Sequence, residues 1–230
     1  MLSPTFIVAF NQAFVRPILG KDGIVSAVSS KAKTAHPDVL AEFGFRIAAS
    51  ALQAGTSVKA VARDTDITEA ANAAAAKRIL EFRSALALND LRLSLKEQQE
   101  GFRLASVYEQ FLKLWPSENV AFSPEIKGNG LLNTCFADLA VGKTLYEVKT
   151  VSRPFHSRDL RQLLVYLALQ SATGEPRWEY GGLLNPRLGV FCSFSVDWLV
   201  TRLSGGRPPK LVFMDFIQSL TRDVVHDRRF

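Results

Sequence analysis

Cysteine and histidine are scarce in this sequence, which has two cysteines and three histidines in 230 residues. Without ligands from another molecule, so few side chains cannot complete a four-cysteine zinc site or hold an iron–sulfur cluster. Small secreted scaffolds also need more cysteines than Cys135 and Cys192. The sequence therefore excludes a disulfide-rich scaffold, and we expect a chain that works in the reduced cytoplasm.

Long apolar runs are missing too. No stretch approaches the roughly 20 apolar residues that span a bilayer, and the first ten residues lack the basic segment of a secretory signal. Glycine and proline are not enriched, at 14 and 10 residues, and 47% of the chain is hydrophobic. This composition excludes general disorder and predicts a globular protein of one or two domains without a membrane partner.

Positive charge is in modest excess, because 28 lysines and arginines outnumber 22 aspartates and glutamates, for a net charge of +6. Such a balance favours association with a polyanion such as nucleic acid, but it says nothing about the fold. The case for DNA as a partner therefore depends on the motifs.

The chain divides into two regions by pattern. Residues 1–95 are rich in alanine and other strong helix formers, as in residues 69–86, and are expected to be mostly helical. Beyond them, short apolar or alternating runs separated by glycine, proline and asparagine indicate strands, with helical segments between and after them. We therefore predict a helical N-terminal region, 1–95, that binds DNA or a partner, and an α/β domain over residues 96–230.

Residues 58–71 have the pattern of a helix-turn-helix, in which Asp66 would take the left-handed turn position and Thr68 would cap the second helix. The same residues also fit two helices of a bundle joined by a polar turn. The bundle is the favoured interpretation, because the alanines at positions 73–76 would leave a recognition helix with few groups for base edges.

The most informative segment is residues 136–151, which indicates a β-hairpin around Gly142-Lys143. Glycine at the first central position suits a two-residue type II′ turn. Counting outward from that turn, residue by residue, opposes Asp138 to Glu147.

Opposed carboxylates destabilise a sheet, so Asp138 and Glu147 need compensation. A divalent cation would supply it, since carboxylate oxygens are ligands that Mg²⁺ prefers. Lys149 lies on the same face as Glu147 and would orient or help deprotonate an attacking water. The alternative is an exposed hairpin on which Glu147 and Lys149 are merely solvated.

Two predicted helices flank this hairpin. Residues 156–170 indicate a helix with Ser157 as N-cap, and four-residue spacing places Arg158, Gln162 and Tyr166 on one of its faces. Upstream, residues 102–114 indicate a helix with a single acid, Glu109, among apolar neighbours. A carboxylate there is costly to bury without a partner, so Glu109 is expected to be either a metal ligand or a surface residue.

This order of residues resembles the PD-(D/E)XK nuclease superfamily, and the Gln162-x-x-x-Tyr166 element is similar to that of its RecB-like branch. The resemblance covers about residues 97–195. It implies a restriction-endonuclease-like fold, a mixed sheet flanked by helices. Ala137 stands where the family name has proline, and the few cysteines exclude the subgroup with an iron–sulfur cluster.

The resemblance also implies roles for single residues. Asp138 and Glu147 would bind Mg²⁺ or Mn²⁺, and the backbone carbonyl of Val148 would add a ligand. Lys149 would assist the water, and Glu109 would help hold metal or water. Near the substrate strand, the site would be lined by Gln162 and Tyr166.

Basic residues gather beside the predicted site, at Arg153, Arg158 and Arg161. Such a cluster would contact DNA phosphates and contribute affinity without reading sequence. The alternative is that these arginines lie at the start of a helix and are merely solvated.

Other chemistries lack their motifs. Gly142-Lys143-Thr144 is similar to the end of a P-loop, but Ala137 occupies the position of the required earlier glycine, and a strand follows where a helix should begin. No Gly-x-Ser-x-Gly pattern supports a serine hydrolase.

The sequence hypothesis is a cytoplasmic Mg²⁺- or Mn²⁺-dependent deoxyribonuclease that hydrolyses phosphodiester bonds in DNA processing or in defence against phage or other foreign DNA. The rival hypothesis is a non-catalytic nucleic-acid-binding or assembly subunit that retains the nuclease fold. Either protein could work beside a helicase, an ATPase or another protein, or as a homo-oligomer.

Overall fold

The computed structural model describes residues 3–30, 34, 36–81, 87–173 and 178–227. In chain order the elements are α1 (Pro4–Phe14), β1 (Arg16–Pro17), β2 (Leu19–Gly20), β3 (Gly23–Ile24), α2 (Pro37–Gln53), α3 (Val58–Val61), α4 (Thr65–Leu80), the 3₁₀ helix η1 (Leu88–Leu91), α5 (Leu95–Leu112), β4 (Val120–Phe122), β5 (Glu125–Ile126), β6 (Cys135–Phe136), β7 (Leu139–Val141), β8 (Thr144–Val148), α6 (Ser157–Ala172), β9 (Tyr180–Asn185), β10 (Val190–Ser195), α7 (Val196–Leu203) and α8 (Pro209–Asp227).

A six-stranded mixed sheet in the order β1-β10-β9-β8-β7-β4 forms the centre of the molecule. Strands β8 and β9 run parallel, whereas the other neighbouring pairs in this sheet are antiparallel. Parallel neighbours need a crossover connection, and α6 lies between β8 and β9 in the chain. The structure is therefore α/β, as the sequence predicts.

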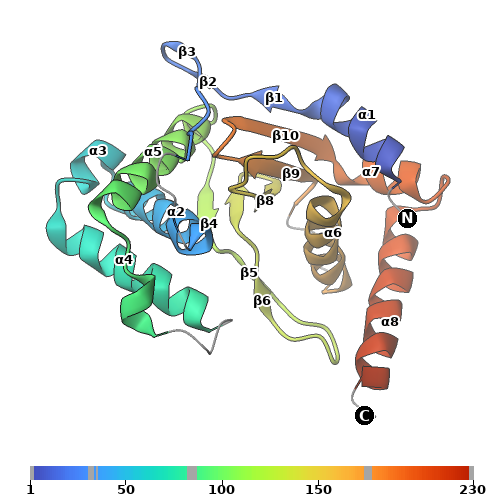
Figure 1. The fold of residues 1–230 in the computed structure, drawn as a ribbon. Helices are drawn as coiled ribbons and strands as arrows, with labels where there is room; N and C mark the ends of the chain where they lie inside the picture. Colours follow the sequence, from blue (N-terminus) through green and yellow to red (C-terminus); the bar gives the residue numbers. More distant parts are fainter. Residues whose placement is uncertain (1–2, 31–33, 35, 82–86, 174–177, 228–230) are drawn as a thin grey trace.

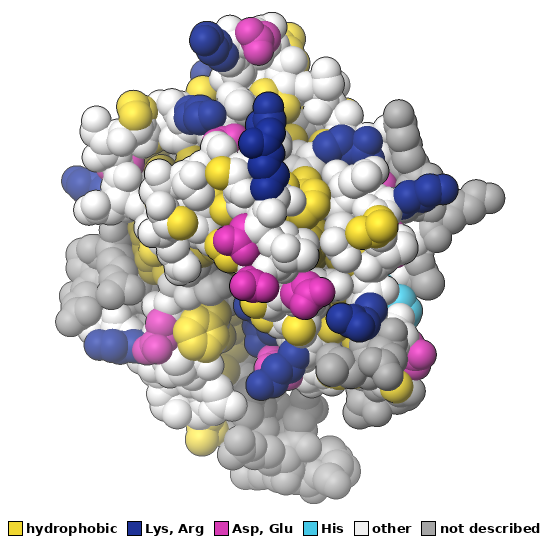
Figure 2. All heavy atoms as spheres, turned by 90° about the vertical axis from the view of Figure 1, so that its left-hand side faces the viewer, with side chains coloured by type: hydrophobic (Ala, Val, Ile, Leu, Met, Phe, Trp, Pro, Cys, Tyr) yellow, Lys and Arg dark blue, Asp and Glu magenta, His cyan; other side chains and the backbone are white. Residues whose placement is uncertain are grey.

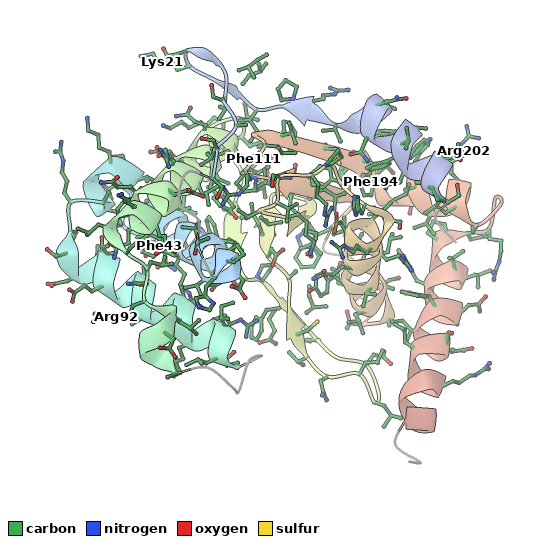
Figure 3. All side chains as sticks on the ribbon, in the orientation of Figure 1. Lys21, Phe43, Arg92, Phe111, Phe194 and Arg202 are labelled. Atoms are coloured by element: carbon green, nitrogen blue, oxygen red, sulfur yellow. The ribbon has the colours of Figure 1, made fainter. Side chains whose placement is uncertain are left out.

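Helices cover both faces of the sheet (Figure 1). On one face, α2, α4 and α5 form a core with Tyr146 and Leu184, and on the other, α6 and α8 form a core with Leu145 and Leu183. Adjacent residues of a strand point to opposite faces, so each strand supplies both cores. In Figure 3, Phe43 and Phe111 mark the first core and Phe194 marks the second.

The predicted hairpin is confirmed with its register, because Leu139 pairs with Tyr146 and Val141 with Thr144. Gly142 has φ 54°. Lys143 has negative φ, because among the described residues Ser123 is the only non-glycine residue with positive φ. This combination is the one expected of a type II′ turn.

The N-terminal region also contributes to the sheet. β1 pairs with β10 through Arg16 and Phe191, and the ring of Phe10 lies 5.6 Å from that of Phe194. Strand β1 is two residues long, too short for a local pattern in the sequence, and its pairing with the edge of β10 defines it. The predicted boundary near residue 95 stays a prediction, but the core of α2, α4 and α5 continues across it.

The helix-turn-helix details of residues 58–71 are wrong. Asp64, not Thr68, is the N-cap of α4, because its side chain accepts the N–H of Ile67 at 3.1 Å. Thr68 lies buried inside α4, and Asp66 does not have positive φ. Since α4 packs on α2, these helices belong to a bundle. The last residues of the predicted helix, 82–86, lie outside the described residues.

A buried ion pair joins distant parts of the chain. Arg187, in the turn between β9 and β10, donates to Oε1 of Glu100 on α5 at 2.7 Å and to the carbonyl of Val28 at 3.2 Å. Both charged side chains are almost fully buried. Among the described helices, none has both the length and the apolar character needed to cross a bilayer.

Candidate active site

The two predicted acidic ligands meet at the end of the β7–β8 hairpin that lies away from its turn. Glu147 lies in β8 and is 1% exposed, while Asp138 immediately precedes β7 and is half-buried. The two carboxyl groups lie close enough for each to influence the pKa of the other. Oδ2 of Asp138 also accepts the backbone N–H of Val148 at 2.7 Å.

The environment disfavours two negative charges here. Burial and then the charge of Asp138 raise the pKa of Glu147 to about 8, although Lys149 opposes the shift. Burial also raises the pKa of Asp138, against the hydrogen bond from Val148 and the charge of Lys149. Without another cation, the pair therefore retains a proton near neutral pH.

Lys149 connects this pair to α6. Its Nζ lies 2.6 Å from Oε1 of Glu147 and donates to Oε1 of Gln162 at 2.9 Å. The amide of Gln162 in turn donates to the hydroxyl of Tyr166 at 3.0 Å. The structure thus brings Asp138, Glu147, Lys149, Gln162 and Tyr166 into one continuous chain of polar contacts.

The start of α6 differs from the expectation. His156, not Ser157, is the N-cap, and its backbone N–H donates to Asp159 at 2.8 Å. Burial opposes ionisation of Asp159, but hydrogen bonds from Arg153 and His156 outweigh it and hold its pKa below the usual value. Because Asp159, at the third helical position, reaches back to this N–H, the N-cap lies one residue earlier than predicted.

The predicted phosphate contacts separate into two kinds. Arg153 forms a two-point ion pair with buried Asp159, with distances of 2.7 and 3.0 Å, so its guanidinium is used inside the protein. In contrast, Arg158 and Arg161 are exposed on α6. These two remain candidates for contact with a polyanion.

Sequence reasoning missed Asn185, which holds the loop that follows Lys149. Its side-chain amide donates to the carbonyls of Val151 and Arg153 at 2.8 and 3.2 Å. Its Oδ1 accepts the N–H groups of Arg187 and Leu188. Its position beside Pro186 at the end of an apolar strand was the available signal.

Glu109 does not join the acidic pair. Its Oε1 lies 3.6 Å from Nζ of Lys113 on α5, whereas its neighbour Tyr108 is buried against the sheet and lines the cleft with Thr150. Successive helical residues point about 100° apart, so α5 cannot turn both Tyr108 and Glu109 toward Asp138.

The helical carboxylate beside Asp138 is instead Glu42, from α2. Its charge contributes to the raised pKa of Asp138, and both residues line the same cleft. Glu42 also forms an ion pair with Arg46 at 2.7 Å. Sequence reasoning missed Glu42 because it lies in the N-terminal region, about a hundred residues from the hairpin.

We name this hollow the Asp138 cleft. It has a volume of about 580 Å³ and is lined by Asp38, Ala41, Glu42, Phe45, Arg46, Arg78, Glu81, Tyr108, Ser123, Phe136, Ala137, Asp138, Val148 and Thr150. Its walls are thus the helical N-terminal region and the edge of the sheet. On the side of the molecule that α3 and α4 form, acidic side chains lie near the centre of the view with lysines and arginines around them (Figure 2).

A divalent cation fits the chemistry of this pair. Oε2 of Glu147 is buried, and no donor in the described part of the chain reaches it. Two touching carboxyl groups suffice for Mg²⁺, which usually keeps several waters and takes one or two carboxylates from a protein. Across the described residues there is no group of three or more acidic, histidine or cysteine side chains arranged as ligands. The donor set therefore suits a hydrated ion, not an enclosed one.

Comparison of the chain with protein-family models, with curated proteins and with solved structures found no match. The candidate site consequently stands on its geometry and on the residue pattern.

Proposed function

We propose that this protein is a metal-dependent nuclease that hydrolyses phosphodiester bonds of DNA, in DNA processing or in defence against foreign DNA. The observation that carries the proposal is the contact between Asp138 and Glu147, with Lys149 bound to Glu147. In this buried setting the two acids share a proton, and a divalent cation that replaces the proton compensates the charges of both carboxylates.

The order of elements supports the same proposal. A helix, α5, precedes the strands that carry Asp138 and Glu147, and the next helix carries Gln162 and Tyr166 before the parallel strand β9. The PD-(D/E)XK resemblance requires this order. We extend the proposal to a restriction-endonuclease-like core formed by α5, β4, β7, β8, α6 and β9.

Asp138, Glu147 and the carbonyl of Val148 would hold Mg²⁺ or Mn²⁺. When bound, the ion would supply positive charge that stabilises the negative charge developing on the phosphate oxygens. Glu42 replaces Glu109 as the proposed accessory carboxylate, since it shares the cleft with Asp138.

Lys149 would position the attacking water. An ammonium has three donors, and Glu147 and Gln162 accept two of them, so the third is directed to water or to a phosphate oxygen. Gln162, itself bound to Tyr166, keeps the lysine in this orientation. In the hydrolysis, a water oxygen forms a bond to phosphorus as the ester bond breaks. The water loses a proton and the leaving oxygen gains one.

The test is cleavage of linear duplex, circular and single-stranded DNA by the purified chain with Mg²⁺ or Mn²⁺, with and without EDTA. The Glu147→Gln variant keeps the size of the side chain and removes its charge. Glu69→Gln makes the same change at an exposed position on α4 and is the matched control.

We expect cutting that requires the metal, is lost in Glu147→Gln and is retained in Glu69→Gln. Cutting that persists in Glu147→Gln contradicts the assigned site. DNA binding without any cutting would favour the rival function, a non-catalytic subunit that works beside a helicase or ATPase.

A further inference from the structure

Phe136 is an exposed aromatic residue at the Asp138 cleft. It ends β6, two residues before Asp138, and 52% of its surface is exposed although it lines the cleft. An isolated exposed phenyl ring is ordinary on a protein surface. This ring differs because the same cleft contains the acidic pair's Asp138.

The other aromatic rings of the cleft are already packed. Phe45 makes edge-to-face contacts with Tyr108 and Phe122, at ring-centre distances of 5.9 and 5.0 Å. In the described part of the chain, no aromatic ring packs on Phe136. Phe136 therefore keeps a ring face for a ligand.

The backbone explains why Phe136 stands clear of the core. Ser123, after β4, has φ 50°, and the chain then leaves the main sheet as the separate β5–β6 hairpin (Figure 1). The N–H of Ser123 donates to the carbonyl of Asp138 at 2.8 Å, and the N–H of Ala137 donates to the carbonyl of Pro124 at 3.0 Å. These bonds hold Phe136 at the junction of the hairpin and the sheet.

The spacing suits a nucleotide. Two residues of extended chain span about 7 Å, so a strand whose phosphate lies at Asp138 has a base within reach of Phe136. Arg46 and Arg78 also line the cleft, each in an ion pair with a neighbouring glutamate, and supply positive charge where a flanking phosphate would pass.

The cleft also limits the form of the nucleic acid. Its volume of about 580 Å³ is that of a pocket for a small molecule or a nucleotide-sized group. A duplex is far larger, since its major groove alone admits an α-helix. In a duplex, moreover, each base lies in the stack and is paired, so its face is not available to Phe136.

We propose that Phe136 stacks on an unpaired nucleobase next to the phosphate that a metal ion at the acidic pair would hold. This inference rests on the proposed nuclease function and specifies its substrate as a single-stranded segment of DNA. Every base has a π-face, so the contact is tolerant of sequence.

The test measures binding without cleavage. In the Glu147→Gln background with EDTA, the full chain is titrated with a single-stranded oligonucleotide that carries 2-aminopurine, and with the matching duplex. Phe136→Ala removes the ring, and Phe136→Trp retains a stacking surface. Leu131→Ala removes an exposed apolar side chain from the same hairpin without altering the cleft, and is the matched control.

We expect Phe136→Ala to weaken single-strand binding roughly 5- to 100-fold and to abolish the fluorescence quenching caused by stacking. Phe136→Trp and Leu131→Ala should bind as the parent does, and duplex affinity should not depend on Phe136. Equal single-strand affinity of the parent and Phe136→Ala overturns the inference, as does an absence of single-strand binding.

The outcomes separate this inference from the proposed function. If DNA is cleaved at the same rate with and without the Phe136 ring, the proposed nuclease function is supported and the stacking site is refuted. If the protein binds single strands through Phe136 but does not cut DNA, the stacking site is supported and the proposed nuclease function is refuted.

Discussion

Nζ of Lys149 lies 2.6 Å from Oε1 of Glu147, a carboxyl that is 1% exposed. The charge of Lys149 also lowers the pKa of Asp138, so one ammonium acts on both acids. Removing one member of a buried charged group leaves its partner uncompensated. The acidic pair and Lys149 therefore act as a unit, and substitutions in it have effects on chemistry and on stability that must be measured separately.

Replacement of Lys149 or Asp138 by alanine should lower the cleavage rate at least 100- to 1000-fold, roughly the loss caused by removing one preorganised electrostatic group. The far-UV circular dichroism spectrum should stay unchanged. Lys143→Ala is the control, because Lys143 lies on the same hairpin with its side chain 68% exposed. Full activity in either site variant would refute the assigned roles.

The stability of the metal-free protein should depend on pH through Glu147. Its pKa rises from 4.5 to about 8 on folding, so the folded state binds more protons than the unfolded state between these values. The contribution of this group to the free energy of unfolding is therefore fully present below about pH 4.5 and is lost as the pH rises toward 8. In urea denaturation, Glu147→Gln should gain stability relative to the native sequence across this window, and a constant difference would contradict the shift.

Mg²⁺ should stabilise the protein more at pH 8 than at pH 6, because the ion must displace the proton that Asp138 and Glu147 share. At 100 times Kd, one bound ion raises Tm by roughly 5–10 °C for a chain of this length. Thermal melts with and without Mg²⁺ check the difference. Glu147→Gln should lose the response, and an equal shift at both pH values would argue against binding at this pair.

Glu42→Gln should weaken metal-dependent cleavage by roughly 10- to 100-fold, as loss of an accessory group at a metal site does. Glu109→Gln should have little effect, because Glu109 lies beside Lys113 and away from the cleft. Glu42 also loses its ion pair with Arg46, but such i,i+4 pairs contribute only about 0.5 kcal/mol. Cleavage rates measured against Mg²⁺ concentration check this, and a larger effect of Glu109→Gln would reverse the assignment.

Arg187→Ala should destabilise the fold by about 3–5 kcal/mol, since it removes the buried guanidinium that pairs with the buried carboxylate of Glu100. Arg103→Ala is the matched control, because Arg103 is exposed and lies 4.0 Å from the same carboxylate, a contact that contributes less than about 1 kcal/mol. Urea denaturation gives both values. A loss below 1 kcal/mol for Arg187→Ala would show that the pair is dispensable.

Several features could be predicted because they depend on neighbours in the chain. The turn at Gly142 sets the register that opposes Asp138 to Glu147, and the four-residue spacing of Gln162 and Tyr166 places them on one helix face. In each case, local backbone geometry and side-chain periodicity are sufficient.

Other features depend on which elements meet in space. The sequence favours Glu109 as the accessory acid and Arg153 as a phosphate contact, but packing turns Tyr108 toward the sheet and pairs Arg153 with Asp159. Glu42 comes from another helix.

The sequence by itself determined the hairpin, its opposed acids and the face of the following helix, because turns and periodicity act over a few residues. Only the tertiary structure decided that Glu42, about a hundred residues away in the chain, lines the same cleft as Asp138. The reason is that the contact between α2 and the edge of the sheet arises from burial of a shared apolar core, which has no local pattern in the chain.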